Sequence, residues 1–329
     1  MKRRIALGAI LMLGLSVPAM ARDMTFGFMG KSADDSNFIV AFHGFQDEAQ
    51  KNGDHAIDIG AKGPEHFRNQ SEALSKGLAQ HLDGIALSVT NSDWLASVIM
   101  PKISAKRIAV VTFDSDFAAK DRHFRGSFIG PDNIEIGRDL GKLAKQFLPH
   151  GGTVWLMTGG QHAARQNPNL TDRLVGVRRE LSGDNAYPEN SSLHGDAGWI
   201  EPNGSPWYTD DDAKVALRQT EITMKDPSVG ALISVGHWPV MDANSFRQTL
   251  APILSDNPAK KRIVIVAVGA VTPEKQALLR DNLIQGYVSI DFDRMGRLAY
   301  QILSKLATGQ KVPDRVTQKN VTITAIKDN

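Results

Sequence analysis

The chain has 329 residues, of which 42% are hydrophobic, and it contains no cysteine. Its 38 Lys and Arg against 36 Asp and Glu give a formal net charge of +2. Without a basic excess, a Lys/Arg cluster or a zinc-finger spacing, the sequence gives nucleic-acid binding little support. The absence of cysteine excludes disulfide bonds.

The first 21 residues have the pattern of a secretory signal peptide. Positive residues at 2–4 precede an apolar run over residues 5–15, and Ala-Met-Ala at 19–21 forms a small-residue cleavage site. The apolar run of about a dozen residues is shorter than the roughly 20 that a membrane-spanning helix needs. We therefore expect cleavage after Ala21. Since no cysteine is available for lipid attachment, we expect a soluble protein in a Gram-negative periplasm.

The part of the chain after Ala21 has a nearly balanced charge, because its 35 basic residues face 36 acidic ones and leave a net charge of −1. Its 308 residues exceed the size at which single hydrophobic cores usually stop growing. We therefore expect two domains.

Short apolar runs rich in β-branched residues recur along the chain, and such runs are typical of strands buried on both faces of a parallel sheet. They lie at residues 24–29, 84–89, 108–113, 153–157, 231–235 and 263–268. Between them are segments with helical periodicity, marked by Phe38, Phe42, Phe45 and Ala49, by Leu74 and Leu78, and by Leu140, Leu143 and Phe147. Alternating strands and helices predict a parallel α/β fold.

The C-terminal part of the chain continues this alternation. An apolar stripe at Met295, Leu298, Ile302 and Leu306 predicts a helix that ends at Gly309, and residues 321–326 predict a last strand. The sequence shows no fixed-period repeat and no low-complexity tract, which makes a solenoid or a disordered tail a poor interpretation.

The sequence contains no motif of a known catalytic class. G-x-S-x-G, Walker A, G-x-G-x-x-G and H-E-x-x-H are all absent, and no histidine is spaced to share a metal with a second ligand. We therefore expect no enzyme activity, no metal and no cofactor. The acidic run at 210–212 precedes a helical segment, so we interpret it as a helix N-cap.

Polar residues follow three of the predicted strands directly. The strand at 24–29 leads to Asp35, the strand at 108–113 leads to Asp114, and the strand at 231–235 leads to Gly236-His237-Trp238. In open parallel sheets, ligands bind beyond the carboxyl ends of the strands. We expect these side chains to form a ligand site.

At these positions the chain resembles the type I periplasmic binding proteins of sugar ABC importers, particularly the ribose-binding branch. The markers are Asp-Ser-Asn-Phe at 35–38 leading to Gly44, Val-Val-Thr-Phe-Asp at 110–114, Ile-Gly-Pro-Asp-Asn at 129–133 and Asp-Arg-Leu-Val-Gly at 172–176. Each marker is weak alone, but their order and spacing are specific, and they extend over nearly all of the chain after the signal peptide.

The resemblance implies two doubly wound parallel-sheet lobes joined by a three-strand hinge. The N-terminal lobe would contain residues 24–130 and 291–318, and the C-terminal lobe residues 131–290 and 319–329. A small hydroxylated ligand would lie between the lobes, and hinge closure would create the form that a membrane partner recognises. We expect a monomer that binds an ABC transporter permease or, alternatively, a sensor kinase or chemoreceptor.

The resemblance also assigns ligand-binding residues. Asp35 and Asn37 occupy the first ligand loop, and Phe38 a ring-stacking position, although Phe38 also begins an apolar helix stripe and fits a core role. Asp114 matches an acid after the fourth strand, with a strand-end cap as its alternative. Arg173 matches an arginine of the second lobe, with a surface salt bridge as its alternative.

Three segments depart from the family pattern. Ser115 replaces an arginine common in the ribose branch, which puts a pentose ligand in doubt. The loop that usually offers an amide and an acid reads Gly236-His237-Trp238, in which His237 and Trp238 offer new contacts, or Trp238 packs in the core. Gly269 stands where an aspartate is usual.

Other candidates come from the last hinge and from two segments that are longer than in the ribose branch. Asp291 lies near a polar contact position, and we expect its neighbour Asp293 to cap the following helix. The longer segments are residues 159–170 and 195–209. The second contains Trp199, Trp207 and Tyr208, and we expect at least one ring, with Trp207 as our candidate, to reach the cleft; the alternative is a small satellite core.

The favoured function is therefore a periplasmic receptor that captures a sugar, polyol or related hydroxylated solute for an ABC importer. A sensory receptor of the same fold, which signals through a membrane histidine kinase or chemoreceptor, is the alternative. An exported enzyme is the least favoured, because no catalytic constellation is present.

Overall fold

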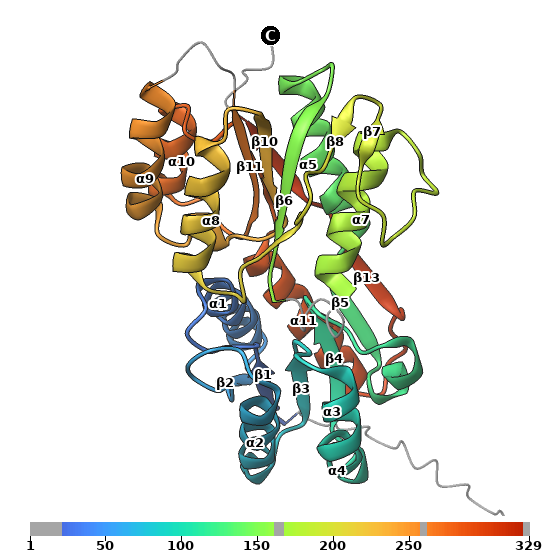
Figure 1. The fold of residues 1–329 in the computed structure, drawn as a ribbon. Coiled ribbons are helices and arrows are strands. Elements are labelled where there is room, and N and C mark those ends of the chain that lie inside the picture. Colours follow the sequence, from blue (N-terminus) through green and yellow to red (C-terminus); the bar gives the residue numbers. More distant parts are fainter. Residues whose placement is uncertain (1–21, 161–167, 257–261, 325–329) are drawn as a thin grey trace, which may run out of the picture.

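Two β-sheets lie one above the other in Figure 1, each flanked by helices. The computed structural model describes residues 22–160, 168–256 and 262–324, so the predicted signal peptide at 1–21 lies outside the described residues. In the described ranges, the helices are too short or too polar to cross a membrane.

The lower sheet in Figure 1, sheet A, is parallel throughout and has the strand order β13-β5-β4-β3-β1-β2. Its strands are β1 (Thr25–Met29), β2 (His55–Asp58), β3 (Gly84–Leu87), β4 (Ala109–Phe113), β5 (Ser127–Pro131) and β13 (Arg315–Gln318). The helices around it are α1 (Ser36–Lys51), α2 (Phe67–Gly77), α3 (Ser92–Val98), α4 (Met100–Ala105) and α11 (Phe292–Ala307). Phe28 packs on Phe45 of α1, whereas the next residue, Met29, joins Leu74 of α2, because successive strand side chains point to opposite faces.

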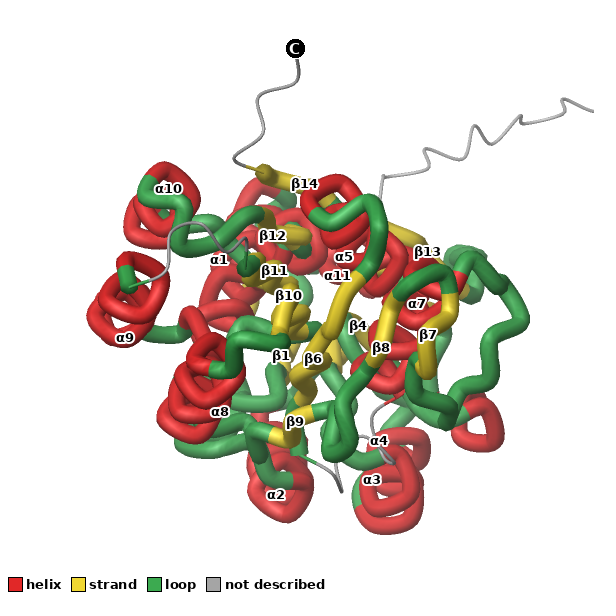
Figure 2. The backbone as a smooth tube through the Cα atoms, turned by 45° about the horizontal axis from the view of Figure 1, so that its top comes forward, coloured by secondary structure: helices red, strands yellow, loops and turns green. Residues whose placement is uncertain are grey.

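The upper sheet, sheet B, is mixed and has the order β14-β12-β11-β10-β6-β8-β7, with β9 paired to β6. Its strands are β6 (Gly152–Thr158), β7 (His194–Asp196), β8 (Trp199–Ile200), β9 (Trp207–Tyr208), β10 (Val229–Ser234), β11 (Ile263–Val268), β12 (Gly286–Ser289) and β14 (Val321–Thr324). The antiparallel pairs are β12 with β14 and β7 with β8, at the two edges. Figure 2 shows the helices of this sheet on its two sides, namely α5 (Asn133–Phe147), α7 (Pro168–Ser182), α8 (Ala213–Lys225), α9 (Ala243–Ser255) and α10 (Pro273–Arg280).

Within the described residues, the chain passes three times between the two sheets. The first crossing joins β5 to α5, the second joins β12 to α11, and the third joins β13 of sheet A to β14 of sheet B. These crossings support the division of the chain near residues 130, 290 and 318, which stays a proposal.

The predicted α/β class and the long buried strands are confirmed. Strand β11 has the predicted bounds, and β1, β3, β4, β6 and β10 differ from the predictions by at most two residues at either end. The predicted C-terminal helix is α11, and Gly309 follows its last turn with a φ of 76°, in the left-handed region that favours glycine. The predicted last strand ends at Thr324, and its residues 325 and 326 lie outside the described residues.

Candidate functional site

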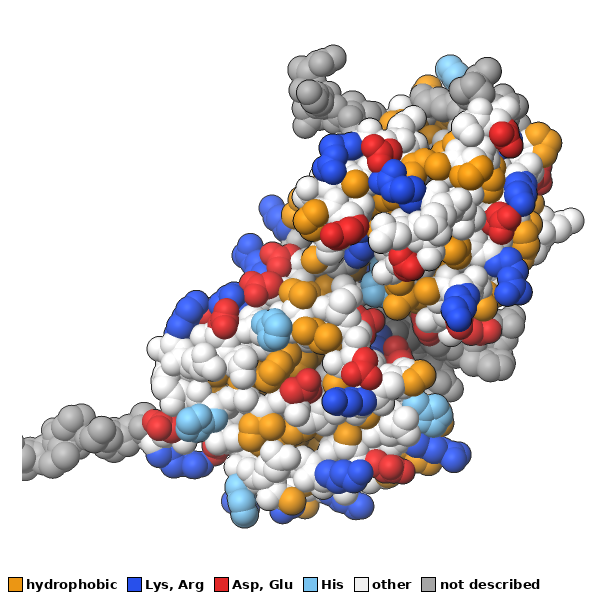
Figure 3. All heavy atoms as spheres, turned by 90° about the vertical axis from the view of Figure 1, so that its left-hand side faces the viewer, with side chains coloured by type: hydrophobic (Ala, Val, Ile, Leu, Met, Phe, Trp, Pro, Cys, Tyr) orange, Lys and Arg blue, Asp and Glu red, His pale blue; other side chains and the backbone are white. Residues whose placement is uncertain are grey.

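A cavity of about 120 Å³ lies between sheets A and B and receives side chains from both. Its polar lining residues are Lys31, Asp35, Asn37, Glu65, Asp114, Asn169, Arg173, Asp211 and His237. Phe38, Trp238 and Phe292 are the aromatic residues of its wall. Figure 3 shows charged side chains in the hollow between the upper and lower parts of the molecule. Polar groups on an aromatic wall are typical of a small-molecule site.

Asp114 lies at the carboxyl end of β4, where sequence analysis predicts a ligand contact. It has a φ of 58°, a left-handed conformation that is uncommon outside glycine. Its Oδ2 accepts a hydrogen bond from Ser88 Oγ at 2.9 Å and lies 3.4 Å from Lys31 Nζ. The side chains of Lys31 and Asp114 are only 9% and 8% exposed, so this ion pair is largely removed from water. Asn169 of α7 donates to the Asp114 backbone carbonyl and joins the two halves of the cavity.

Arg173 is buried, with 7% of its surface exposed, which contradicts the alternative of a surface salt bridge. It follows Asn169 by one helical turn on α7, so both side chains share the face that meets the cavity. Its Nε donates to Asn133 Oδ1 at 2.9 Å and its Nη1 donates to the Val235 carbonyl at 3.0 Å. Burial lowers the pKa of Arg173, and the carboxylates of Asp114 and Asp172 oppose that shift.

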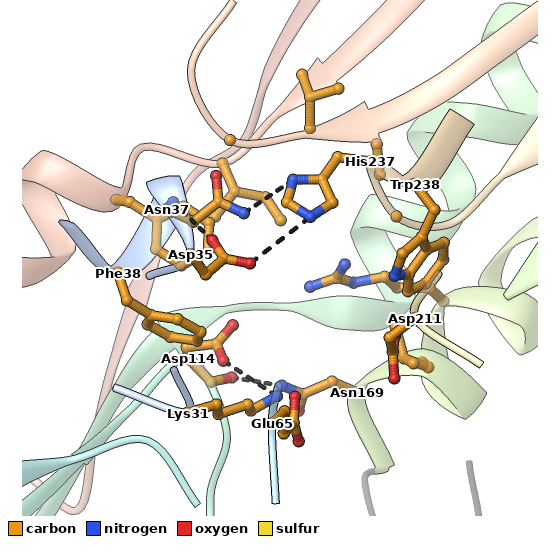
Figure 4. Close-up of a pocket in the computed structure, with 18 residues that line it drawn as sticks. Lys31, Asp35, Asn37, Phe38, Glu65, Asp114, Asn169, Asp211, His237 and Trp238 are labelled. Carbon is orange, nitrogen blue, oxygen red and sulfur yellow. Dashed lines mark hydrogen bonds and ion pairs between the residues drawn. The ribbon is translucent and has the colours of Figure 1, made fainter. Parts of the chain in front are cut away.

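His237 contacts the N-terminal turn of α1 from the opposite side of the cavity (Figure 4). Asn37 Nδ2 lies 3.1 Å from His237 Nδ1, and Asp35 Oδ2 lies 3.7 Å from His237 Nε2. Asp35 is also the N-cap of α1, since its Oδ1 accepts from the Asn37 backbone N–H at 2.7 Å. Burial lowers the pKa of His237, which favours the neutral ring. A neutral ring with its proton on Nε2 accepts from Asn37 and faces Asp35 with N–H.

Two glycines replace polar residues of the family pattern because other side chains occupy the space. A Cβ at Gly269 would lie 2.0 Å from Asn37 Oδ1, and a Cβ at Gly236 would lie 2.5 Å from the Trp238 ring. Both distances are far below van der Waals contact, so any larger residue would displace Asn37 or Trp238. The cavity therefore carries Asn37 and Trp238 where the pattern predicts an acid and an amide.

The aromatic wall combines packing with exposure to the cavity. Phe38 lies edge-on to Phe113 and Phe292, with ring centroids 6.2 and 6.0 Å away. It is largely buried, so its core role and its position in the wall coexist. Trp238 is also buried and lines the cavity beside Asp211 (Figure 4).

Three predicted site residues do not line the cavity. Ser115 is buried beside it, and its backbone carbonyl accepts from the Val89 backbone N–H. Asp291 is the N-cap of α11, with its Oδ1 accepting from the Arg294 backbone N–H at 2.9 Å. The expectation that Asp293 caps this helix is wrong.

Trp207 is the third of these residues. Its ring stacks on Trp155 with centroids 4.5 Å apart, and its Nε1 donates to Thr223 Oγ1 at 2.9 Å. Trp199 is fully buried in the same half of the molecule. Neither these rings nor Tyr208 lines the cavity. Trp199 belongs to the main hydrophobic core and Trp207 packs against it, so these rings do not form the separate satellite core that was the alternative.

Sequence reasoning missed four polar lining residues. Lys31 follows β1 by two residues, so it could have been predicted by the same reasoning as Asp114, from its position after a strand. Asn169 lies on the same helix face as Arg173, one turn before it. Glu65 has no local signal, because it lies in the segment that precedes α2.

Asp211 is the fourth, and the N-cap interpretation concealed it. Asp212 caps α8 as predicted, by accepting from the Lys214 and Val215 backbone N–H groups. Asp211 has a φ of 59° and lines the cavity instead. Burial raises the pKa of Asp211, and Lys31 opposes that shift.

No group of His, Cys, Asp and Glu in the described ranges is arranged to hold a metal ion. The lining of the cavity offers hydrogen-bonding groups, charges and ring faces.

The comparisons with known proteins agree with this geometry. Residues 26–311 match the family model described as periplasmic binding protein domain. The fold is shared with GanP, a glucose-galactose binding protein from Geobacillus stearothermophilus, at a TM-score of 0.73 and 20% identity, with 92% of this chain and 98% of that chain covered. No curated protein sequence matches the chain.

Two further solved structures have similar folds. A solute-binding protein of an ABC transporter from Agrobacterium vitis, bound with α-D-tagatopyranose, has a TM-score of 0.75 and 16% identity over 92% of this chain and 95% of its own. A solute-binding protein from Burkholderia graminis, in complex with D-arabinose, has a TM-score of 0.71 and 22% identity over 92% and 96%. Because the family model matches most of its length, the chain belongs to the periplasmic binding protein family.

Proposed function

We propose that the protein captures a sugar, polyol or related hydroxylated solute between its two sheets and delivers it to an ABC importer. The observation that carries this proposal is the mixed lining of the cavity, in which planar Asp, Asn and Arg groups from both sheets surround a space with an aromatic wall. The similar solved structures are described as a glucose-galactose binding protein and as complexes with tagatose or arabinose. These descriptions support the same class of ligand.

The physics of hydroxyl recognition fits this lining. Each sugar hydroxyl donates and accepts, so its burial is costly unless both roles are satisfied. Arg173 and Asn169 supply donors, and Asp35 and Asp114 supply acceptors, while Phe38 offers an apolar surface for C–H groups.

Closure of the two halves accompanies binding in this proposal. The contacts of Asn37 with His237, and of Asn169 with Asp114, already join elements of the two sheets across the cavity. A hinge motion along the three chain crossings would open and close this site. The proposal places the mature protein, after cleavage at Ala21, in the periplasm as a monomer without catalytic activity. Transport is preferred over sensing because the similar structures are described as ABC transporter solute-binding proteins.

A thermal-shift screen tests the proposed ligand class. Pentoses, hexoses, polyols and disaccharides are compared with amino acids and peptides. A ligand that binds only the native state adds about 2.7 kcal/mol to the free energy of unfolding at 100 times its dissociation constant. We expect a shift with at least one hydroxylated solute. A shift with amino acids or peptides alone would overturn the proposal.

A further inference from the structure

The cavity has more acidic than basic side chains. Its four carboxylates belong to Asp35, Glu65, Asp114 and Asp211, and its two permanent cations are Lys31 and Arg173. His237 does not correct this difference, since burial lowers its pKa and favours the neutral ring. Among the lining side chains, carboxylates therefore outnumber cations, and outside the lining Lys275 acts on Asp35 and His237.

The excess is concentrated around Lys31. Its Nζ lies 3.4 Å from Asp114 Oδ2, and the same ammonium is the cation that interacts with Glu65 and Asp211. Burial acts to lower the pKa of Lys31, yet the pKa is raised because these carboxylates surround it. The Lys31 ammonium thus interacts with three carboxylates. Because it forms its ion pair with Asp114, its positive charge only partly offsets the negative charges of Glu65 and Asp211.

Glu65 and Asp211 both line the cavity and are exposed to solvent. Desolvation by the surrounding protein raises the pKa of Glu65 to about 7, and Asp211, Asp114 and Asp35 add to the shift while Lys31 opposes it. The pKa of Asp211 is also raised, mainly by burial. A cation placed near both groups would favour their ionised forms.

The cavity also offers hydrogen-bond donors. Arg173 uses Nε and Nη1 for Asn133 and Val235 and still lines the cavity, and Asn169, one turn before it on α7, donates to the Asp114 carbonyl close to Lys31 and Glu65 (Figure 4). Such groups suit hydroxyl or ether oxygens. The lining thus combines carboxylates with donors, and one ligand that matches both has a cationic group and a hydroxylated body.

We propose that the captured solute is a sugar or polyol that carries a protonated amine, with the ammonium between Glu65 and Asp211. This inference rests on the proposed function and narrows its substrate class. Two carboxylates hold an ammonium by charge-assisted hydrogen bonds, which are roughly twice as strong as neutral ones. A bare metal ion is a poor alternative, since the described residues contain no group arranged to hold one.

Isothermal titration calorimetry with matched sugars tests the inference. D-Glucosamine and D-galactosamine are compared with D-glucose, D-galactose and the two N-acetylated amines, which keep the nitrogen but lose the charge. We expect at least one amine to bind about tenfold or more tightly than its neutral partners, as one charged hydrogen bond of about 1.5 to 3 kcal/mol provides. Equal affinity of amine and neutral sugar overturns the inference and leaves the proposed function intact.

Proton exchange provides a second readout on the same protein. At about pH 6.5 a Glu65 with a pKa of about 7 is largely protonated, so an ammonium that binds beside it expels part of a proton. We expect proton release for the amine, measured in buffers of different ionisation enthalpy, and none for the neutral sugar. Binding of the amine without release contradicts the placement of the ammonium beside Glu65.

Charge-neutral variants locate the ammonium. Glu65→Gln and Asp211→Asn keep the side-chain shape, and Glu221→Gln, an exposed residue of α8 paired with Lys225, is the matched control. We expect a tenfold or larger loss of amine affinity in the first two variants, a smaller loss of affinity for any neutral sugar that binds, and no effect of the control. Unchanged amine affinity in both cavity variants, each confirmed as folded by its melting curve, overturns the inference. If none of the six sugars binds, the inference is overturned, and the thermal-shift screen still decides the proposed function.

Discussion

The side-chain oxygen Oδ1 of Asn37 lies 2.0 Å from the place where a Cβ on residue 269 would stand, and residue 269 is glycine. Asn37 belongs to α1 of sheet A, whereas Gly269 follows β11 of sheet B. Because Gly269 has no side chain, the polar side chain of Asn37 from the other half of the molecule can occupy this space. Asn37 uses this position to reach His237 Nδ1 at 3.1 Å.

Gly269→Ala should weaken ligand binding while the protein still folds. The added methyl group displaces Asn37 and breaks its contact with His237, so we expect affinity to fall about tenfold, the equivalent of about 1.4 kcal/mol. Titration calorimetry measures the loss. Ala270→Asp, at the exposed neighbouring position, is the control and should leave affinity unchanged. Equal effects of both variants would argue against the close packing of Asn37 on Gly269.

Arg173→Ala should abolish binding and also lower stability. The variant leaves Asn133 Oδ1 and the Val235 carbonyl without their donor, and an unsatisfied buried acceptor costs about 1 to 3 kcal/mol. We expect a loss of this size in urea unfolding together with no measurable ligand affinity. Arg247→Ala, which removes an ion pair with Asp281 near the surface, should cost about 1 kcal/mol or less and leave binding intact. Retained affinity in Arg173→Ala would remove this residue from the site.

Protonation of His237 should destabilise the folded state. Burial lowers its pKa below 6.5, with Lys275 and Arg173 acting in the same direction and Asp35 and Asp211 against it. Below pH 6.5 the unfolded chain therefore binds more protons at this residue than the folded one, so this contribution to stability is lost as pH falls through the folded pKa.

The variant His237→Gln isolates that contribution. Urea unfolding of both proteins at about pH 7.5 and about pH 5.5 gives the comparison, in which other titrating groups are common to both. We expect the wild-type protein to lose more stability than the variant between the two pH values. An equal or smaller loss would show that His237 is not held in its neutral form.

The sequence was informative where burial alone determines structure. Runs such as that of β11 are apolar throughout because both faces of the strand are covered, and the run predicts the strand directly. Strand β2, His55–Asp58, has no such signal, because it is an edge strand with two exposed residues. Strands β7 to β9 have two or three residues each, too few for a period to be recognised.

Site residues could be predicted where they directly follow a strand, as Asp114 does, or lie within a segment that resembles the family, as Arg173 does. Glu65 could not be found in this way, since it reaches the cavity from a loop whose course depends on tertiary packing. Asp211 was concealed by a local rule that holds for its neighbour Asp212. Trp207 was misplaced because aromatic residues in a Gly/Pro-rich segment indicate packing but not which surface they pack on.

Variants of Trp207 and Trp238 should separate stability from binding. Trp207→Phe removes the hydrogen bond to Thr223 outside the cavity, so we expect it to cost about 0.5 to 1.5 kcal/mol of stability without changing affinity. Trp238→Phe removes part of the cavity wall, so affinity should fall about tenfold. Calorimetry and thermal melts of both variants give the comparison. If only Trp207→Phe lost affinity, the segment at 195–209 would belong to the ligand site after all.

Lys31 and Asp114 should be strongly coupled, because each is almost fully buried and 3.4 Å separates their charged atoms. Lys31→Met leaves the Asp114 carboxylate with Ser88 as its remaining side-chain donor, and breaking a buried ion pair costs about 3 to 5 kcal/mol. Asp114→Asn leaves the ammonium with Glu65 and Asp211 still nearby, so its cost should be smaller. The double variant removes both charges, so it should be more stable than the sum of the single losses predicts, with a coupling energy of about 1 to 3 kcal/mol in urea unfolding. Additive losses would mean that water compensates each charge separately, and the cavity floor would then be open to solvent.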